Sequence, residues 1–396
     1  MSTEALVEIS RFYGNNPEYI LAGGGNTSWK DEDTLYVKAS GFSLAELSAE
    51  SFVKMDRKKL ALIWEKTYPE SSEQRESAVL ADMMAARKEG EGQKRPSVEA
   101  LLHDIIPFSY VVHLHPAMVN GLACSRDGEK EAEKLFGEDM IWIPSTNPGY
   151  ILSGFVKFKM AEYFKKYQKK APIILLQNHG VFTGADSADG IKNLYNEMMF
   201  KIGEKIKKYP DFTNEEIIKP FSRRCADTDN ANPASVPAPH SISSRLTGIK
   251  FDLLQTLSQI AGASAFMTSN EIERLVKDKT SFIPVSSAFT PDHIVYAGSD
   301  PLFTEAQTAQ EFIQDWENNA RKTGRKAKII AVKSIGIFSA AVNEKAALFA
   351  LELFKDTVKV AVYTEAFGGY LFMTQEKIDF INNWEVERFR SAVSTK

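Results

Sequence analysis

Two kinds of hydrophobic pattern alternate along the first part of the chain. Short apolar runs at 34–38, 110–114 and 173–177 are bounded by polar and turn-forming residues, which predicts strands. Apolar residues recur at helical spacing over 162–167 and 191–208, which predicts helices. Because strands and helices alternate, the pattern indicates an α/β domain.

The stretch 223–245 interrupts this alternation. It contains three prolines and several small polar residues, and it lacks an aliphatic period. This composition is typical of an extended connector. We therefore predict a first domain over 1–222, a linker over 223–245 and a second domain over 246–396.

A weak internal repeat joins the two predicted domains. The segment that starts at Ile173 resembles the segment that starts at Ile329, and both read as strand, glycine turn, short strand and long helix. Where the first copy has Asn178 and His179, the second has Ser334 and an isoleucine, Ile335. The second domain is thus expected to be a diverged copy that does not share the chemistry of the first.

Composition supports two folded domains and excludes several classes. The chain has 396 residues, of which 43% are hydrophobic and 25% are charged, which excludes disordered and fibrous proteins. No apolar run is long enough to span a membrane, and the acidic start lacks the pattern of a signal peptide. We expect a cytoplasmic protein with no membrane partner.

Charge and cysteine content narrow the possible ligands. The net charge is −4, with 48 basic and 52 acidic residues interspersed, so no nucleic-acid partner is expected. The only cysteines, Cys124 and Cys225, are too few for a disulfide framework or a thiolate metal site. A bound metal would therefore be held by nitrogen and oxygen atoms.

Three of the six histidines form a candidate metal site. His113 and His115 alternate with Leu114 in an apolar strand, so both imidazoles face the same side. His179 ends another apolar strand and precedes Gly180. Three neutral imidazoles with an open position suit a catalytic Zn²⁺ or another divalent metal. The alternative is that the pair is incidental and His179 is an ordinary turn residue.

A carboxylate upstream of the histidine pair is a candidate general base. Ser97 is predicted to cap a short helix that opens with Glu99, and this helix would bring the carboxylate back beside the metal. The alternative is that Glu99 only complements the helix dipole. His103, one turn further along, is predicted to be structural.

A glycine-rich stretch near the start is a candidate phosphate cradle. Three consecutive glycines at 23–25 free the backbone to turn its amides toward an anion. The stretch matches neither the dinucleotide fingerprint nor the Walker motif, and a plain hairpin connection is the alternative. The side chains that add donors nearby are Asn26, Thr27, Ser28, Lys30 and Ser40.

Together, the motifs GGGNTSWK, VKASG, PSVE, HLHP and QNHG resemble those of the class II aldolase/adducin family in order and spacing. The resemblance implies an α/β/α sandwich with a central, mostly antiparallel sheet, followed by a diverged second domain of similar fold. It also implies zinc ligands at His113, His115 and His179 and a catalytic acid/base at Glu99. The residues that it places at the substrate phosphate are Asn26, Ser40, Gly41 and Ser97.

The second half extends the resemblance. The sequences TPDH at 290–293 and WEVE at 384–387 look like the aldolase portion of bifunctional rhamnulose-1-phosphate aldolase/alcohol dehydrogenases. This implies cleavage of a ketose 1-phosphate of the L-rhamnulose type to dihydroxyacetone phosphate and an aldehyde such as lactaldehyde. Tyr150 is a candidate proton donor on the aldehyde side, and a homo-oligomer, either a dimer or a tetramer, is expected.

Two other functions stay open from the sequence. An epimerase of a pentulose phosphate or a dehydratase of a thiosugar phosphate would use the same metal, enolisation chemistry and phosphate pocket. A non-catalytic, adducin-like scaffold would keep the fold and lose the site. Retention of all three histidines and Glu99 argues against the scaffold.

Overall fold

The computed structural model describes residues 3–222 and 248–384. The predicted linker at 223–245 and residues 385–387 of the WEVE motif lie outside the described residues. The described chain divides into two compact units. The first comprises 3–208, 289–291 and 362–384, and the second comprises 209–222, 248–288 and 292–361.

The first unit is built on a seven-stranded sheet with the strand order β3-β2-β1-β4-β7-β6-β5. All neighbours in it run antiparallel except β5 and β6, so the mostly antiparallel sheet predicted from the family resemblance is confirmed. The strands are β1 (Asn26–Lys30), β2 (Thr34–Lys38), β3 (Phe52–Asp56), β4 (Tyr110–Leu114), β5 (Met140–Ile143), β6 (Ile173–Leu176) and β7 (Gly180–Ala185).

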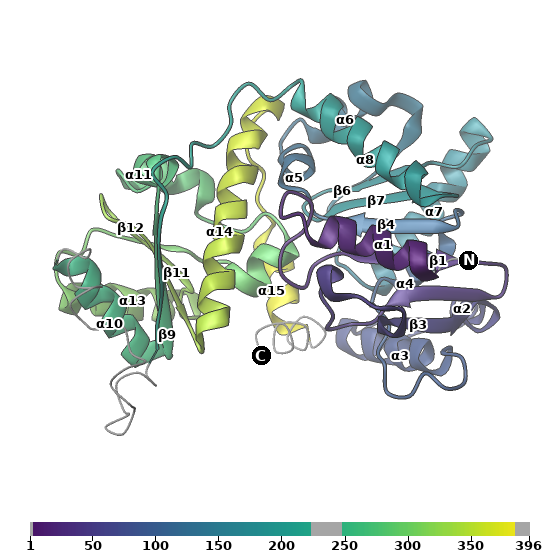
Figure 1. Ribbon diagram of the computed structural model, residues 1–396, viewed down its shortest axis with the longest axis horizontal. Coiled ribbons are helices and arrows are strands. Elements are labelled where there is room, and N and C mark those ends of the chain that lie inside the picture. Colours follow the sequence, from purple (N-terminus) through teal and green to yellow (C-terminus); the bar gives the residue numbers. More distant parts are fainter. Residues whose placement is uncertain (1–2, 223–247, 385–396) are drawn as a thin grey trace. The chain divides into compact units, whose positions relative to one another are not determined.

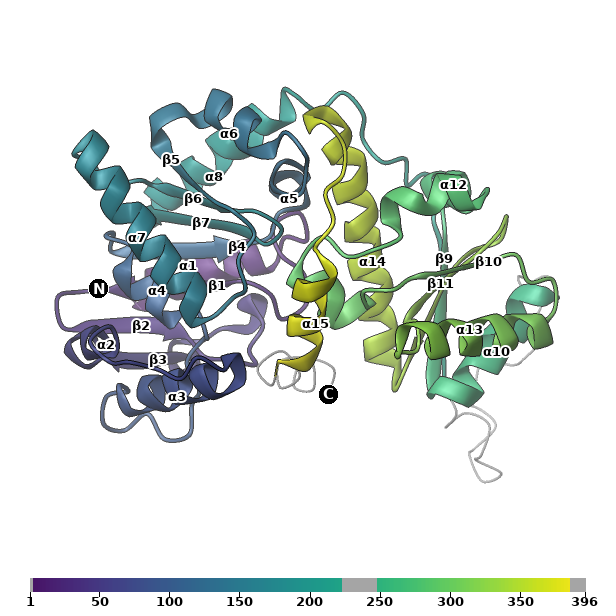
Figure 2. The same cartoon turned by 180° about the vertical axis from the view of Figure 1, so that it is seen from behind.

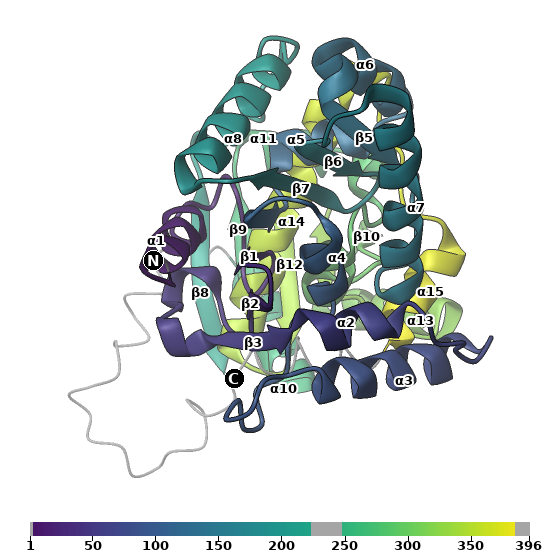
Figure 3. The same cartoon turned by 90° about the vertical axis from the view of Figure 1, so that its right-hand side faces the viewer.

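Helices cover both faces of this sheet. In Figure 1, α1 and α8 lie in front of the sheet, and Figure 2 shows α7 in front when the molecule is turned around. Figure 3 shows α1 and α8 on one side of the strands, with α4 and α7 on the other. The helices are α1 (Thr3–Gly14), α2 (Arg57–Ile63), α3 (Ser72–Ala85), α4 (Ala100–Ile105), α5 (Ala117–Ala123), α6 (Gly128–Phe136), α7 (Tyr150–Tyr167), α8 (Ala188–Gly203) and α15 (Gln375–Asn383).

The central strand β4 shows why the sheet needs cover on both sides. All five of its residues are buried. Val111 packs with Ile174 and Phe182 in one core cluster, while on the other face the hydroxyl of Tyr195 donates to the carbonyl of Val112. A strand that is apolar on both faces is stable only between two layers of helices. The α/β/α sandwich follows from this pattern.

The second unit has a five-stranded sheet with the order β10-β11-β12-β9-β8. Its strands are β8 (Glu216–Ser222), β9 (Ala263–Thr268), β10 (Leu302–Thr304), β11 (Ile329–Val332) and β12 (Gly336–Ala341). Its helices are α10 (Ile249–Ala261), α11 (Asn270–Leu275), α12 (Lys279–Phe282), α13 (Ala309–Thr323) and α14 (Glu344–Thr364), the last of which continues into the first unit.

The second sheet reproduces five strands of the first in order and direction. In both, the edge pair is parallel (β5·β6 and β10·β11) and the other pairs are antiparallel. The register agrees as well, because Leu176 pairs with Gly180 and, in the second sheet, Val332 pairs with Gly336. The internal repeat predicted from the sequence is thus present in the backbone, and descent of the second unit from an aldolase domain stays a prediction.

The chain does not divide consecutively between the units, which differs from the domain limits that the sequence indicates. Strand β8, which lies within the predicted limits of the first domain, pairs with β9 in the second sheet. The segment 362–384 belongs to the first unit, where the Leu371 N–H donates to the Cys124 carbonyl at 2.8 Å. Hydrophobic periodicity identifies a strand or helix, but it does not specify the partner against which that element packs.

Within the described ranges, the structure contains no helix that is both long enough and apolar enough to cross a lipid bilayer.

Candidate functional site

The three predicted histidines come together at one end of the central strands. His113 lies in β4 and His115 directly follows that strand, so the period of two turns both rings to one face. His179 lies in the turn between β6 and β7, and β7 lies between β4 and β6 in the sheet. One ring nitrogen from each histidine lies within 4.8 Å of the other two.

The β6–β7 turn has the backbone shape needed to bring His179 to this point. Asn178 adopts a left-handed conformation, with φ 59°, and its side-chain amide donates to the Leu371 carbonyl at 2.8 Å. Gly180 follows, and a Cβ there would lie 2.5 Å from Cδ2 of His115 and 2.6 Å from the Leu114 carbonyl oxygen. Only glycine allows the turn to approach the end of β4 this closely.

The hydrogen bonding of His113 fits a bound cation. Its Nδ1 lies 3.0 Å from the carbonyl oxygen of Val181 and must donate to it, which leaves a lone pair on Nε2. That Nε2 faces Nε2 of His115 at 2.9 Å. A backbone carbonyl that fixes the tautomer of a histidine in this way is the usual support of a metal ligand. The three imidazoles therefore form a donor set suited to Zn²⁺ or a similar divalent metal.

Glu99 lies beside the three rings. Its Oε1 atom is 3.5 Å from Nε2 of His113 and 3.6 Å from Nε2 of His179. This oxygen is buried and has no hydrogen-bond partner among residues 3–222 and 248–384. A carboxylate oxygen that is buried without a donor is costly unless a cation or a reacting proton comes to it.

The other carboxylate oxygen of Glu99 is anchored. Its Oε2 accepts a hydrogen bond from Nδ2 of Asn26 at 2.6 Å. Glu99 stands at the N-cap of α4, which begins at Ala100, and its own N–H donates to Oγ of Ser97 at 3.2 Å. Ser97 was predicted to cap the helix, but its hydroxyl instead closes a local turn with the Glu99 N–H. Glu99 was predicted to open the helix, but it lies one residue before it.

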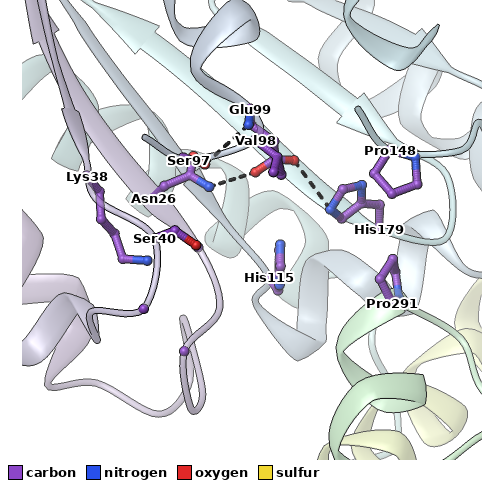
Figure 4. Close-up of a pocket in the computed structure, with 13 residues that line it drawn as sticks. Asn26, Lys38, Ser40, Ser97, Val98, Glu99, His115, Pro148, His179 and Pro291 are labelled. Carbon is purple, nitrogen blue, oxygen red and sulfur yellow. Dashed lines mark hydrogen bonds and ion pairs between the residues drawn. The ribbon is translucent and has the colours of Figure 1, made fainter. Parts of the chain in front are cut away.

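A pocket adjoins this cluster and opens to solvent. It encloses about 590 Å³, a volume that includes open solvent at its mouth. In Figure 4, Lys38 and Ser40 lie on one side of the pocket, and His179 and Pro148 lie on the other. The predicted site residues that line it are Asn26, Ser40, Gly41, Ser97, Glu99, His115 and His179.

Lys38 also lines this pocket, although it is not among the donors predicted from the sequence. Its residue is only 5% exposed, and it ends β2 just before Ser40 and Gly41. The signal available in the sequence was a lysine on the same face of the strand as Tyr36, two residues before the serine–glycine pair at 40–41. A cation beside two hydrogen-bonding residues suits an anionic group of a substrate.

Three of the predicted phosphate donors lie elsewhere. The Thr27 hydroxyl is buried on the opposite face of β1, where it bonds to the hydroxyl of Ser10 at 2.7 Å. The Ser28 hydroxyl bonds to Nδ1 of His103 at 2.6 Å, and Nζ of Lys30 donates to the His103 carbonyl at 2.6 Å. The stretch after the glycines is a strand, so alternate side chains turn away from the loop.

Tyr150 is likewise placed in a different environment. Its ring stacks on Trp64, with centroids 5.5 Å apart, and packs edge-on against Tyr68. Its backbone N–H donates to a carboxylate oxygen of Glu76 at 3.0 Å. Burial, with the Glu76 charge adding to it, raises the pKa of the Tyr150 hydroxyl. These contacts assign Tyr150 to the packing of α7.

Burial also changes the titration of two groups behind the site. It holds the pKa of His103 well below its usual value, so this ring is neutral at physiological pH. Burial lowers the pKa of Lys30 to about 7, against a partial opposing effect from Asp104. Behind the pocket, His103 is thus neutral and Lys30 is only partly protonated near pH 7.

Comparisons with known proteins agree with this arrangement. Residues 4–200 match the family described as Class II Aldolase and Adducin N-terminal domain. An uncharacterized oxidoreductase, YuxG of Bacillus subtilis (strain 168), is 28% identical over 197 residues. That match covers 47% of this chain and 27% of the relative, so the chain spans about a quarter of the curated relative that it matches.

Two solved structures are also similar in fold. The N-terminal class II aldolase domain of a conserved protein from Thermoplasma acidophilum has a TM-score of 0.44 and 23% identity, covering 52% of this chain and 94% of that domain. An L-fuculose 1-phosphate aldolase has a TM-score of 0.36 and 18% identity, covering 51% of this chain and 83% of its own. By the family match alone, residues 4–200 of this chain are similar to the class II aldolase and adducin N-terminal domain family.

Proposed function

We propose that this protein is a divalent-metal-dependent aldolase. Its substrate would be a ketose 1-phosphate of the L-rhamnulose type, which it would cleave to dihydroxyacetone phosphate and an aldehyde such as lactaldehyde. The observation that supports this most is the cluster of His113, His115 and His179 beside a polar pocket, with Oε1 of Glu99 at 3.5 Å from Nε2 of His113 and 3.6 Å from Nε2 of His179.

The chemistry divides between the metal site and the carboxylate. A divalent cation held by the three uncharged imidazoles would supply Lewis-acid polarisation of the substrate carbonyl. Oε1 of Glu99 would take the proton from the C4 hydroxyl as the bond between C3 and C4 breaks and C4 becomes an aldehyde. Glu99 would then return that proton to C3, which completes dihydroxyacetone phosphate.

The opposite side of the pocket would hold the phosphate. Lys38 offers a positive charge, and Ser40 and Ser97 offer hydroxyl groups in the same pocket as Gly41. Holding the phosphate at a fixed distance from Glu99 would place the reacting carbons beside Oε1 of Glu99. This positioning would turn binding of the phosphate into a faster cleavage step.

The reaction can be tested by following dihydroxyacetone phosphate. The purified full chain, loaded with Zn²⁺, Co²⁺ or Mn²⁺, would be incubated with L-rhamnulose 1-phosphate and L-fuculose 1-phosphate, and the product would be measured by a coupled reduction. Release of dihydroxyacetone phosphate that stops on metal removal supports the proposal. A metal-loaded chain that instead interconverts pentulose phosphates would contradict it and indicate an epimerase.

Replacing Glu99 by glutamine should separate metal binding from cleavage. We expect Glu99→Gln to retain bound metal but to lose cleavage by on the order of 10²-fold or more, because the amide cannot take up the proton. Glu76→Gln is a matched control, since Glu76 is a buried carboxylate that instead accepts from the Tyr150 N–H. Equal activity of Glu99→Gln and the wild type would rule out this role.

A further inference from the structure

One histidine outside the metal cluster is held by three consecutive same-face residues of β1. Asn26, Ser28 and Lys30 alternate along the strand and all contact His103 of α4. Oδ1 of Asn26 bonds to the Nε2 side of the ring, the hydroxyl of Ser28 bonds to Nδ1, and Lys30 binds the backbone carbonyl. His103 is completely buried, so these bonds are shielded from water.

The direction of these hydrogen bonds follows from Glu99. Nδ2 of Asn26 donates to Oε2 of Glu99 at 2.6 Å, so the amide nitrogen of Asn26 is the group that lies against the carboxylate. The amide oxygen of Asn26 then faces Nε2 of His103, which must carry the proton. Nδ1 of this neutral ring is left as an acceptor, and the Ser28 hydroxyl donates to it. The bonds run in one direction, from Ser28 through His103 and Asn26 to Glu99.

We propose that His103 is a positioning residue for Glu99, acting through the orientation of the Asn26 amide. This inference rests on the proposed function, in which Glu99 moves the proton. If the amide of Asn26 turned over, its oxygen would face the carboxylate of Glu99 and its nitrogen would face the N–H of His103. Both contacts would be repulsive, so the Nε2–H tautomer of His103 locks the amide in the orientation that serves Glu99.

The consequence for Glu99 is a carboxylate with two distinct oxygens. Oε2 is fixed by Asn26, and Oε1 is thereby directed at the imidazoles of His113 and His179. A base whose position is set before substrate arrives loses little rate to reorientation. The competing role for His103 is packing alone, because its ring lies edge-on to Phe182 with centroids 5.5 Å apart.

Two substitutions separate positioning from packing. His103→Phe keeps a ring against Phe182 but has no donor for Asn26, whereas His103→Gln offers an amide N–H near the position of Nε2. We expect His103→Phe to lower kcat by about tenfold to a hundredfold, with KM and bound metal close to the wild type. His103→Gln should recover most of that loss. Equal kcat in His103→Phe and the wild type, or equal losses in both variants, would overturn the proposal.

A second measurement does not depend on activity. In ¹⁵N-histidine NMR of the full chain, His103, assigned by its absence in His103→Gln, should show a protonated Nε2 and an unprotonated Nδ1. Asn26→Leu should weaken this preference, since it removes the acceptor of the Nε2 proton. A proton on Nδ1 in the wild type would overturn the relay even if His103→Phe fails to fold. A wild type that cleaves no ketose phosphate but shows the expected tautomer would instead contradict only the proposed function.

Discussion

At the scale of single residues, two buried lysines on neighbouring strands differ in position and therefore in role. Lys38 lines the pocket at the end of β2, where a charge can meet a substrate. Lys30 on β1 instead binds the carbonyl of His103 behind the site. Burial lowers the pKa of Lys30 to about 7, so about half of the Lys30 side chains are neutral near physiological pH. Burying the charged form of Lys30 destabilises the folded chain, so the free energy of unfolding depends on pH.

The sign of this dependence follows from linkage. Between about pH 7 and the unfolded pKa near 10.5, the unfolded chain holds the Lys30 proton more tightly than the folded chain does. The free energy of unfolding should therefore rise with pH, by about 2 kcal/mol between pH 7 and pH 9 from this group. Lys30→Met should lack this increment when urea unfolding is measured at both pH values. Parallel pH dependences of the two proteins would contradict the assignment.

Lys38 should act on substrate binding. Lys38→Met is expected to raise KM for a ketose 1-phosphate about tenfold to a hundredfold, because a charged hydrogen bond contributes roughly 1.5–3 kcal/mol. The change in kcat should be smaller. Lys54→Met on the adjacent strand is the control, since that residue is exposed. An unchanged KM in Lys38→Met would place the phosphate elsewhere.

The sequence predicts part of this site for a clear physical reason. The period of two in a strand places His113 and His115 on one face without knowledge of the fold. The same rule would have placed Asn26 and Ser28 on one face and Thr27 on the other, had the stretch been predicted as a strand. The glycines before it favoured a loop. The partnership of Asn26 with Glu99 depends on the pairing of β1 with β4, which no local pattern contains.

At the scale of elements, the turn between β6 and β7 and the turn between β11 and β12 have the same backbone conformation but different side chains. Asn178 and Ser334 both have φ 59°, and each is followed two residues later by a glycine. A Cβ on Gly180 would lie 2.5 Å from His115, and one on Gly336 would lie 2.6 Å from the ring of Phe266. Both turns thus press closely on the end of the neighbouring strand. Glycine recurs here because of packing, whether or not an imidazole is present.

Substituting glycines tests this close approach. Gly180→Ala should lower the free energy of unfolding by about 1–3 kcal/mol and weaken metal retention, because His115 must move to admit the methyl group. Gly154→Ala in α7 is the matched control, and it should raise the free energy of unfolding. Its nearest neighbour, Trp64, is 4.0 Å away, so the helix should gain about 0.5–1 kcal/mol. A thermal midpoint of Gly180→Ala that equals or exceeds that of Gly154→Ala would contradict the close contact at Gly180.

At the scale of the whole molecule, the chain leaves the first unit and returns to it. Residues 362–384 pack with elements that precede residue 208. The side-chain amide of Asn178 donates to the Leu371 carbonyl, and Nζ of Lys377 donates to the Ser145 carbonyl. Neither partner can be read from sequence, since each bond joins positions nearly two hundred residues or more apart. The turn that holds His179 thus depends on a late part of the chain.

Shortening the chain tests this dependence. A chain that ends at residue 361 should lose several kcal/mol from the first unit, because each lost hydrogen bond contributes about 1 kcal/mol in addition to the lost packing. A chain that ends at Trp384 retains all of these contacts and serves as the control. The thermal midpoint and metal content of both chains would be compared. Equal midpoints would show that the returning segment adds nothing to the first unit.

The second sheet also shows how little separates a metal-binding scaffold from an inert one. By strand register, Phe266 and Thr268 occupy the positions of His113 and His115, and Ile335 occupies that of His179. The backbone that aims the ligands is therefore retained where the ligands are not. Histidine placed at those three positions would therefore test by design whether the second backbone can also direct three imidazoles at one metal ion.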